Sequence, residues 1–272
     1  MPYAMITGAA KGIGKAIATE LAKRGYGLLL VDIDDAKLKA TVAELQASGV
    51  TVHALQQDLA QQDAVEKIIA FTTPYHNQLN VVVNNAGHGL NGSFEQLSLA
   101  EQFGIIDVNI KAQVAITHAY ITVLRQFPKS YLLNVGSIAA YQPVPYLNMY
   151  AASKAFVLSF NRSLRYELRK STISVSCLSP GPTDTDFVKR ARMGASTLKL
   201  SERFNMTAEA VGKIAVEGMF IEKAEIIPGF INLLNAFLPK FFHKSFVEKI
   251  AARIYEPKHE ALPSAKEGAM ME

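Results

Sequence analysis

The stretch that decides the fold is TGAAKGIG, residues 7–14, in which Gly8, Gly12 and Gly14 follow a short apolar run, YAMIT at 3–7. The run predicts a β-strand, and the apolar spacing after the glycines predicts an α-helix. Glycines at a strand-to-helix turn permit a tight bend and let the backbone approach a pyrophosphate, which then lies at the helix N-terminus. A glycine turn that serves only packing is the alternative. No Gly-Lys-Ser/Thr follows, so the stretch is not a P-loop.

Strand-like and helical segments alternate downstream of this turn. Helices are expected at 13–24 and at 35–48, and a glycine follows each of them. The strand-like runs are nearly continuous in Leu, Val and Ile, as is typical of strands that helices cover on both faces. The sequence therefore predicts an α/β fold with a Rossmann-type doubly wound parallel sheet in three layers, α/β/α. The expected strands are 3–7, 27–32, 51–56, 79–85, 130–136 and 173–179.

One domain accounts for most of the chain. Its 272 residues, 49% of them hydrophobic, suffice for a large core. We expect a single Rossmann-fold dinucleotide-binding domain at 1–255 that includes a C-terminal helical extension. Within it, the basic segment at about 186–207 suits a substrate lid, and the segment at about 226–255 is an apolar extension. Residues 256–272 are polar, contain two prolines and are expected to form a loose tail.

Composition excludes several classes of protein. The net charge is only +4 and no long run of Lys or Arg occurs, so we expect no nucleic-acid partner. The single cysteine, Cys177, cannot form an internal disulfide and lies in an apolar run, which favours a buried thiol in a reducing compartment. The apolar N-terminus is too short for a signal peptide, and no stretch of about 18 apolar residues could span a membrane. We therefore expect a soluble, cytoplasmic protein.

The end of the second expected strand bears on the choice of cofactor. A carboxylate at Asp32 can accept hydrogen bonds from both ribose hydroxyls of an adenosine and repels a 2′-phosphate. Ile33 stands where an arginine would favour the phosphorylated cofactor. Lys11, a cation within the glycine loop, argues the other way because it could attract that phosphate; a solvent-exposed lysine is its alternative. We favour NAD and keep NADP open. A helix-capping or strand-end aspartate is the plain alternative for Asp32.

Further motifs follow in an order that resembles the short-chain dehydrogenase/reductase family. They cover roughly residues 3–190, and the apolar segment near the C-terminus is similar to that of a subgroup of ketoacyl reductases and steroid dehydrogenases. Each motif is short, but their combination and order are specific. The motifs are TGAAKGIG at 7–14, Asp58–Leu59, NNAG at 84–87, DVN ending at Asn109, NVGSIAA with Ser137, YAASK from Tyr150 to Lys154, and PGPTDT at 180–185.

The resemblance implies an NAD(P)-dependent oxidoreductase in which Tyr150 is the general acid/base and residues 1–255 form a catalytic domain. A free phenol has a pKa near ~10, which is too high for a base at neutral pH. Tyr150 and Lys154 lie four positions apart on an expected helix and hence on one face. A nearby ammonium lowers the pKa of a phenol. We therefore expect Lys154 to make Tyr150 usable at physiological pH and to hold the nicotinamide ribose. A core aromatic residue is the plain alternative for Tyr150.

Two further residues complete the catalytic set that the resemblance implies. Ser137, at the end of an expected strand, would donate a hydrogen bond to the substrate oxygen. Asn109 resembles the family asparagine that anchors a water molecule leading to Lys154. The alternatives are a serine in a plain turn for Ser137 and a buried polar or helix-kink residue for Asn109.

The resemblance also assigns residues around the cofactor. NNAG would form the surface beneath the adenine ribose. For Asn84 the alternative is a purely structural role in the sheet. Asp58–Leu59 would flank the adenine. Thr185 matches a family threonine near the nicotinamide carboxamide or the phosphates. Thr183 departs from the aliphatic residue usual in the family, a change that a backbone contact would survive. The expected cofactor-binding residues are Gly8, Lys11, Gly12, Ile13, Gly14, Asp32, Asp58, Leu59, Asn85, Ala86, Gly87, Tyr150, Lys154, Pro180, Gly181, Thr183 and Thr185.

The expected substrate is a small apolar carbonyl compound or secondary alcohol, because the segments that would face it are mostly apolar. His88 either lines this pocket or is a solvated loop residue. The cations of the lid either meet a phosphate or acyl-carrier group or are only solvated. No His/Cys/Asp cluster has the spacing of zinc ligands, so no metal is expected. The segments are Gly89–Leu90, Ile138–Ala139, Pro143–Tyr146 and Phe187 to about Asn205.

Partners and a rival function remain to be named. The resemblance implies a homodimer or homotetramer paired through helices at about 99–126 and 149–170. For the apolar extension we expect, in this order, a wall of the substrate pocket, a subunit contact or a membrane-surface contact. The rival to an enzyme is a catalytically silent dinucleotide-binding sensor or scaffold. The set of Ser137, Tyr150 and Lys154 weighs against it, because a sensor needs no phenol.

Overall fold

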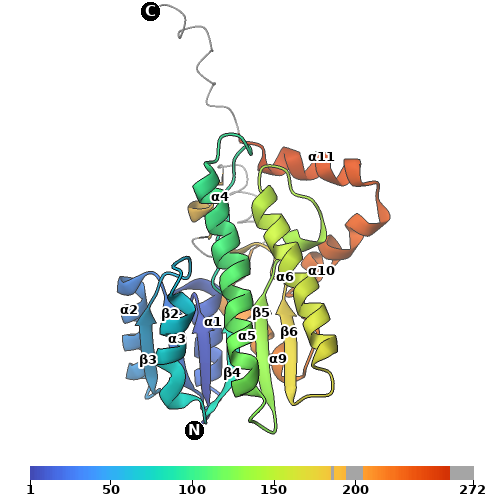
Figure 1. Ribbon diagram of the computed structural model, residues 1–272. Coiled ribbons are helices and arrows are strands. Elements are labelled where there is room, and N and C mark those ends of the chain that lie inside the picture. The colour runs from blue at the N-terminus through green and yellow to red at the C-terminus, as the bar shows by residue number, and fades with distance from the viewer. Residues whose placement is uncertain (185–186, 194–204, 258–272) are drawn as a thin grey trace, which may run out of the picture.

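A seven-stranded sheet forms the centre of the molecule. The computed structural model describes residues 1–184, 187–193 and 205–257. The sheet has the order β3-β2-β1-β4-β5-β6-β9, and each neighbouring pair is parallel (Figure 1). The predicted doubly wound α/β fold is thereby confirmed, with the reversal of strand order between β1 and β4. The strands are β1 Tyr3–Thr7, β2 Gly27–Asp32, β3 Val52–Gln56, β4 Leu79–Asn84, β5 Ser130–Val135, β6 Ile173–Leu178 and β9 Glu225–Ile226.

Helices connect the strands, and their ends differ slightly from the predicted ones. The helix predicted at 13–24 begins at Gly12 and ends at Ala22, and the one predicted at 35–48 ends at Ala47. The single long helix expected at 99–126 is wrong in detail, because a π-helical segment, η2 Asp107–Ala112, divides it into two α-helices. The helices are α1 Gly12–Ala22, α2 Asp35–Ala47, α3 Ala64–Thr72, α4 Leu99–Ile106, α5 Gln113–Leu124, α6 Asn148–Glu167 and α9 Ala208–Phe220.

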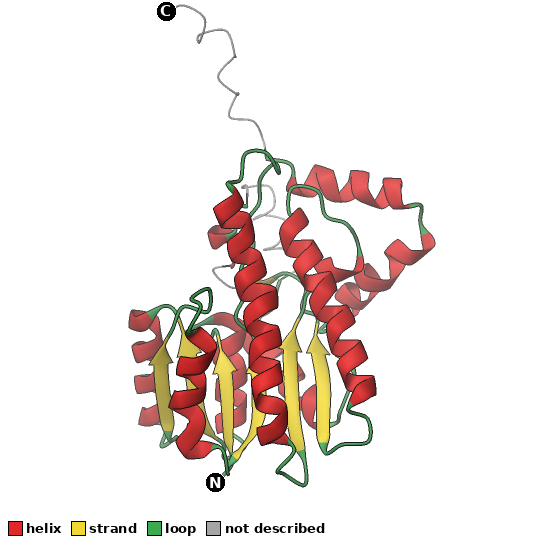
Figure 2. Ribbon diagram, viewed as in Figure 1, coloured by secondary structure: helices red, strands yellow, loops and turns green. Residues whose placement is uncertain are grey.

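The helices form two layers, one on each face of the sheet (Figure 2). Alternate residues of β1 enter opposite cores: Ala4 and Ile6 pack on one face, and Tyr3 and Met5 on the other. This alternation follows from the two-residue period of a strand. Because both faces are buried, apolar residues fill every position of the strand, as the sequence pattern indicated. The first core contains residues of α1, α2 and α9, and the second contains residues of α3, α5 and α6.

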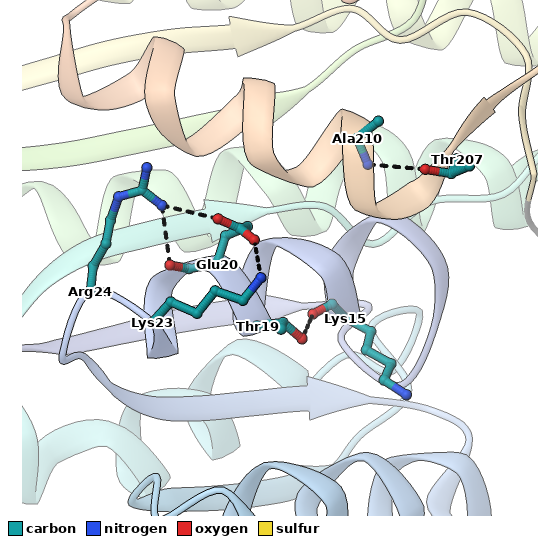
Figure 3. Close-up of polar contacts among 7 residues, drawn as sticks. All are labelled: Lys15, Thr19, Glu20, Lys23, Arg24, Thr207 and Ala210. Atoms are coloured by element: carbon teal, nitrogen blue, oxygen red, sulfur yellow. Dashed lines mark hydrogen bonds and ion pairs between the residues drawn. The ribbon is translucent and has the colours of Figure 1, made fainter.

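The packing of α1 against α9 fixes the helix that follows the glycine turn (Figure 3). A Cβ added at Gly212 of α9 would lie 2.7 Å from the Cβ of Ala16 in α1, so the two helices are in close contact. At its outer face, α1 is supported by Glu20, whose carboxylate accepts hydrogen bonds from Lys23 at 2.6 Å and from Arg24 at 3.3 Å. The α1 N-terminus is therefore held by its neighbour as well as by its own turn.

The C-terminal extension projects beyond the β6–β9 end of the sheet (Figure 1). It consists of α10 Phe230–Phe237, the short 3₁₀ helix η4 Leu238–Phe241 and α11 Lys244–Tyr255. Across the part of the chain that the structure describes, no helix combines the length and apolar character needed to cross a membrane.

The segment predicted as a lid is described only in part. It begins with a short helix, α7 Phe187–Arg190, and ends with β8 Met206–Thr207, which pairs with β7 Thr183–Asp184. Residues 194–204, in the middle of the predicted lid, lie outside the described residues, as do Thr185 and most of the predicted tail.

Candidate active site

The predicted motifs meet at one edge of the sheet. Each of β1, β4, β5 and β6 ends at this edge, and the glycine loop, NNAG, Ser137 and Pro180 directly follow these four strands. In open parallel sheets, ligands bind outside the carboxyl ends of the strands, where the strand order reverses. The reversal here lies between β1 and β4, which are the strands that carry the two glycine-containing motifs.

The glycine loop leaves no room for side chains. Gly8 and Gly12 have positive φ angles of 66° and 58°, which glycine adopts without strain. A Cβ added at Gly14 would overlap with the carbonyl oxygen of Gly8 and lie 2.5 Å from Nδ2 of Asn85. That Nδ2 group donates hydrogen bonds to the carbonyl oxygens of Thr7 and Gly8, both at 2.9 Å. The NNAG motif therefore braces the loop, and the amides at the start of α1 are available for an anion.

Asp32 lies beside this loop rather than pointing away from it. Its Oδ2 atom accepts a hydrogen bond from the backbone N–H of Ala10 at 2.8 Å, and its Oδ1 atom accepts one from the backbone N–H of Asp34 at 3.0 Å. The hydroxyl of Thr41 fixes the same loop by donating to the carbonyl oxygen of Ala10 at 2.8 Å. The carboxylate at the end of β2 is thus oriented by the loop, and Ile33 beside it is half exposed. Lys11 is the residue before α1 and has an extended backbone.

The Asp58–Leu59 pair serves local structure. Oδ1 of Asp58 accepts a hydrogen bond from the backbone N–H of Ala60 at 2.9 Å, and Leu59 packs against the core on the α3–α5–α6 face. Neither contact excludes the predicted place beside an adenine. The carboxylate of Asp58 also lies close enough to His88 to raise the pKa of that imidazole slightly, against larger effects that lower it.

Asn109 connects the loop after β4 to the second turn of α6. It is fully buried in the π-helical segment, where its Oδ1 accepts from the backbone N–H of His88 at 3.0 Å. Its Nδ2 donates to the carbonyl oxygen of His88 and to Oγ of Ser153, each at 2.9 Å. Ser153 in turn donates to the carbonyl oxygen of Tyr150 at 2.7 Å. Ser153 was not predicted, although it stands beside Lys154 in YAASK. The wide turn of a π-helix is frequent at functional sites.

Ser137, Tyr150 and Lys154 come together as the sequence predicted. The Ser137 side chain lies close enough to the Tyr150 hydroxyl to lower its pKa, and Oγ of Ser137 accepts a hydrogen bond from the backbone N–H of Ala139 at 3.1 Å. The Nζ atom of Lys154 lies 5.7 Å from the centroid of the Tyr150 ring and donates to the carbonyl oxygen of Val135 at 2.8 Å. The Lys154 side chain is only 3% exposed, so the ammonium has little contact with bulk water.

Tyr150 and Lys154 both have shifted pKa values. Burial raises the pKa of Tyr150 to about 12, although nearby Ser137 lowers it and the side chain keeps some contact with solvent. Burial also lowers the pKa of Lys154 to about 8. Burial is thus the largest influence on the phenol pKa in the protein alone, and the pKa-lowering role of Lys154 beside a bound nicotinamide stays a prediction. At neutral pH the phenol carries its proton, and Lys154 exchanges its own proton near neutrality.

Residues outside the motifs enclose the Tyr150 ring. A Cβ added at Gly89 would lie 2.8 Å from Cδ2 of Tyr150, so the loop after β4 packs directly on the ring. The ring of Phe187 lies 5.1 Å from that of Tyr150. Tyr255, the last residue of α11, is close enough to raise the pKa of Tyr150, and it was not predicted. An apolar cluster of Val144, Leu147, Ala151 and Ala251, with Ala139, Tyr150, Met193 and Tyr255 packed against it, continues this wall.

His88 lies in the same place but is not a solvated loop residue. It is partly buried, and burial is the main cause that lowers its pKa, followed by Arg190 and Lys154. A Cβ added at Gly104 of α4 would lie 3.8 Å from its Nε2 atom, so the imidazole points toward α4. The neutral form of His88 is therefore favoured at neutral pH.

The segment after β6 closes the far side of the site. The carbonyl oxygen of Pro180 accepts from the backbone N–H of Ile138 at 3.0 Å, and the hydroxyl of buried Thr183 donates to the carbonyl oxygen of Gly181 at 3.0 Å. A Cβ added at Gly181 would overlap with the side-chain amide of Asn232 in α10. The C-terminal extension therefore packs against the segment that follows β6, a contact that no sequence motif indicated. In the described ranges, no group of three His, Cys, Asp or Glu residues could hold a metal ion.

Comparison with known proteins agrees with this geometry. Residues 2–195 match the family model described as short chain dehydrogenase. Sulfoacetaldehyde reductase 2 of Chromohalobacter salexigens is 34% identical over 185 residues, 67% of this chain and 73% of that protein. Human 17-beta-hydroxysteroid dehydrogenase type 3 is 31% identical over 243 residues, 86% of this chain and 76% of that protein.

A solved structure matches nearly the whole molecule. The short-chain dehydrogenase from Sphingobium yanoikuyae, in complex with NADPH, superimposes with a TM-score of 0.77 at 26% identity over 97% of this chain and 99% of that chain. The family model, the identities and the shared fold together show that the chain belongs to the short-chain dehydrogenase family of NAD(P)-dependent oxidoreductases.

Proposed function

We propose that the chain interconverts an apolar secondary alcohol and its ketone, with Tyr150 as the general acid/base. The observation that carries the proposal is the approach of the Ser137 side chain to the Tyr150 hydroxyl, with buried Lys154 on the next turn of α6. A phenol and a second hydroxyl that meet at one point can both contact a single substrate oxygen.

The residues at the strand ends fit a nicotinamide dinucleotide. The amides at the start of α1, next to a loop that its glycines keep free of side chains, suit a pyrophosphate, and the Asp32 carboxylate suits a ribose. We assign the remaining cofactor contacts to Lys11, Ile13, Asp58–Leu59 and the residues from Asn85 to Gly87, and to Lys154 and the segment from Pro180 to Thr183. When bound there, the nicotinamide supplies hydride to a carbonyl carbon or accepts it from an alcohol carbon.

The side chains divide the work on the substrate oxygen. During reduction, Tyr150 gives its proton to the carbonyl oxygen as that oxygen gains negative charge, and during oxidation it takes the hydroxyl proton. Ser137 donates a hydrogen bond to the same oxygen, because its Oγ already accepts from Ala139 and its hydroxyl hydrogen can be directed to the substrate. We assign to Lys154, whose pKa is lowered to about 8, the return of a proton to Tyr150 through a water molecule that Asn109 would anchor. The raised pKa of Tyr150 suits the acid role, hence reduction, at neutral pH.

The preferred cofactor is NAD. The orientation of Asp32 by the glycine loop supports this choice, since the carboxylate stands where it would repel a 2′-phosphate. Ile33 supplies no compensating positive charge. The relative from Sphingobium yanoikuyae was solved with NADPH, so the choice needs a direct measurement with both cofactors.

We propose an apolar substrate that is bulkier than the small carbonyl compound expected from the sequence. The names of the two relatives point to different substrates, a small aldehyde with a sulfonate for one and a hydroxysteroid for the other. The wall beside Tyr150 consists of apolar and aromatic side chains, with Phe187 5.1 Å from the catalytic ring and the cluster around Val144 and Leu147 next to it. Such a wall favours the second kind of substrate. The alternative of a catalytically silent sensor gains no support from relatives that are named as reductases and dehydrogenases.

Substitution of the phenol tests the proposal. Tyr150→Phe should lower kcat for a series of ketones about a hundredfold to ten-thousandfold, while fluorescence titration of the nicotinamide cofactors changes little. Tyr166→Phe is the matched control, because it removes an exposed hydroxyl at the other end of the same helix. Turnover by Tyr150→Phe at the rate of the control would refute the acid/base role.

We also propose that copies of the chain pair through α4, α5 and α6, as homodimers or homotetramers. Leu99 and Phe103 on α4 and Phe156 on α6 are large apolar side chains that are exposed in the single chain. Burial of such side chains is a common source of subunit association. Light scattering of the Phe156→Ser variant beside the unmodified chain should show a smaller mass for the variant; equal masses would contradict this pairing.

A further inference from the structure

The helix α10 presents its apolar side chains to solvent instead of to the protein. The residues that it buries are the polar Asn232 and the small Ala236, which lie four apart on one face. Its large side chains recur at the helical spacing of the opposite face, where they are exposed. An ordinary surface helix has the reverse arrangement. The exposed apolar residues of α10 are Phe230, Ile231, Leu233, Leu234 and Phe237.

The same arrangement continues through η4 and α11. Leu238 and Phe241 are exposed in η4, and Phe241 is 83% exposed. The ring centroids of Phe242 and Phe246 lie 5.8 Å apart, yet both side chains remain exposed. On α11 only Ala251 is fully buried, whereas Phe246 and Ile250, four apart, point outward. We call the exposed apolar residues between Phe230 and Ile250 the outer face of the extension.

Positive charge lies among these apolar side chains. Lys240, Lys244, Lys249 and Arg253 are exposed within the extension, and Glu248 is its one carboxylate between Phe230 and Tyr255. The Nζ atom of Lys240 lies 4.7 Å from the centroid of the Phe237 ring, so charged and aromatic groups share one surface. Aromatic and aliphatic side chains interleaved with lysines are typical of helices that lie in the interface of an anionic lipid bilayer.

We propose that the outer face of the extension docks on the surface of a bilayer that contains anionic lipids. The pocket wall, the first expectation from the sequence, accounts only for the inner face, where Ala251 and Tyr255 contact the site. A second copy of the chain would bring the same lysines and arginine against each other, whereas anionic headgroups complement them. Because no described helix is long and apolar enough to cross a membrane, the extension lies on the surface rather than spanning it. The inference does not depend on the proposed reaction.

Co-sedimentation of the full chain with vesicles tests this surface, without cofactor or substrate. The unmodified chain should bind vesicles of phosphatidylcholine with phosphatidylglycerol and bind vesicles of phosphatidylcholine alone much more weakly. The double variant Phe230→Ser, Phe241→Ser should lose about a hundredfold in partitioning, roughly tenfold for each phenylalanine removed from the interface. The variant Lys240→Glu, Lys244→Glu should lose binding to the anionic vesicles selectively.

The matched control changes the opposite end of the molecule. Ile221→Ser with Lys223→Glu removes an apolar side chain that is 67% exposed and reverses one charge in the turn before β9, at the amino edge of the sheet. It should bind vesicles as the unmodified chain does. The proposal is wrong if the unmodified chain stays in the supernatant with anionic vesicles, or if the control and the outer-face variants lose binding equally. It is also wrong if, without lipid, the outer-face variants alone have a smaller mass by light scattering, because a second copy would then cover this face.

Discussion

The glycine-loop region and the C-terminal extension make their contacts in different ways. Around the loop, backbone groups and short polar side chains contact one another directly, as in the bonds from Asn85 to the carbonyl oxygens of Thr7 and Gly8. The extension touches the body of the protein mainly through Asn232, Ala236, Ala251 and its last tyrosine, and leaves its large side chains outside. The first region therefore tolerates almost no change of shape, whereas the second can vary on its outer face without disturbing the fold. We expect cofactor binding to depend on the first and substrate fit on the second.

The largest effect is expected from a methyl group in the loop. Gly14→Ala would place its Cβ against the carbonyl oxygen of Gly8, so cofactor affinity should fall by about a hundredfold or more through displacement of the loop. Gly104→Ala is the control, because the nearest atom to its Cβ is 3.8 Å away and alanine favours a helix. Fluorescence titration of the cofactor, with circular dichroism to verify folding, measures both. If the Gly14→Ala protein folded and bound the cofactor as the unmodified chain does, the glycine loop would tolerate a change of shape and the contrast with the extension would be wrong.

The second effect concerns the buried ammonium. The pKa of Lys154 is lowered from 10.5 to about 8, so above pH 8 the folded protein releases this proton before the unfolded chain does. The free energy of unfolding should therefore rise with pH between about 8 and 10.5, by up to about 1.4 kcal/mol per pH unit, in the unmodified chain but not in Lys154→Met.

Denaturant unfolding of both proteins at several pH values measures this difference. Cys177, whose pKa is raised to about 11, and Tyr150, whose pKa is raised to about 12, oppose the rise at higher pH, but they are present in both proteins and largely cancel. Lys240→Met, which removes an exposed lysine of the extension, is the control and should keep the pH dependence of the unmodified chain. If the free energy of unfolding changed with pH in the same way for the unmodified chain and Lys154→Met, burial would not lower the pKa of Lys154.

A smaller change is expected at the adenosine end. Asp32→Ala should shift the ratio of kcat/KM with NAD and with NADP about tenfold toward NADP, because a negative charge near the 2′-phosphate is lost. Asp34→Ala is the control: it removes the N-terminal cap of α2, where Oδ1 accepts from Lys37, and should cost about 1 kcal/mol of stability without changing cofactor preference. If the ratio of the two kcat/KM values did not change in Asp32→Ala, Asp32 would serve only to hold the glycine loop and not to select the cofactor.

The smallest effect is expected in the extension. Tyr255→Ala should raise KM for bulky ketones by roughly threefold to tenfold through loss of one wall, while the Kd of the cofactor stays the same. Arg253→Ala, an exposed residue of the same helix, should change neither constant. If Tyr255→Ala weakened cofactor binding instead, the extension would not act on substrate fit alone, and the contrast between the two regions would be wrong.

The sequence predicted what is local along the chain. The glycines of residues 7–14 and the Tyr150–Lys154 pair could be found because turn geometry and helical spacing relate neighbouring residues directly. The parallel sheet followed from the alternation of strands and helices, and the grouping of Ser137 with Tyr150 followed from the resemblance to the family.

The contacts that join distant segments could not be predicted. The approach of Asn232 to Gly181 and of Tyr255 to Tyr150 depends on how the extension folds back, and no motif encodes that. The burial of Tyr150, which raises its pKa, could not be predicted for a related reason: the spacing of two residues on a helix can be read from the sequence, but burial depends on the whole wall around the ring. The π-helical segment that holds Asn109 likewise has no signature, because its sequence DVNIKA mixes polar and apolar residues as a regular helix does.

Because of the π-helical segment, the position of Asn109 depends more on the number of residues between Asp107 and Ala112 than on which residues they are. A residue deleted between Asp107 and Ala112 would let the wide turn tighten into a regular α-helix while α4 and α5 keep their relative orientation, so the change would fall on the position of Asn109 itself. Asn109 could no longer hold both backbone groups of His88 and also reach Ser153. Substitutions on the solvent side of this helix are therefore tolerable where a one-residue indel is not, and relatives that keep the same catalytic group must conserve the residue count here.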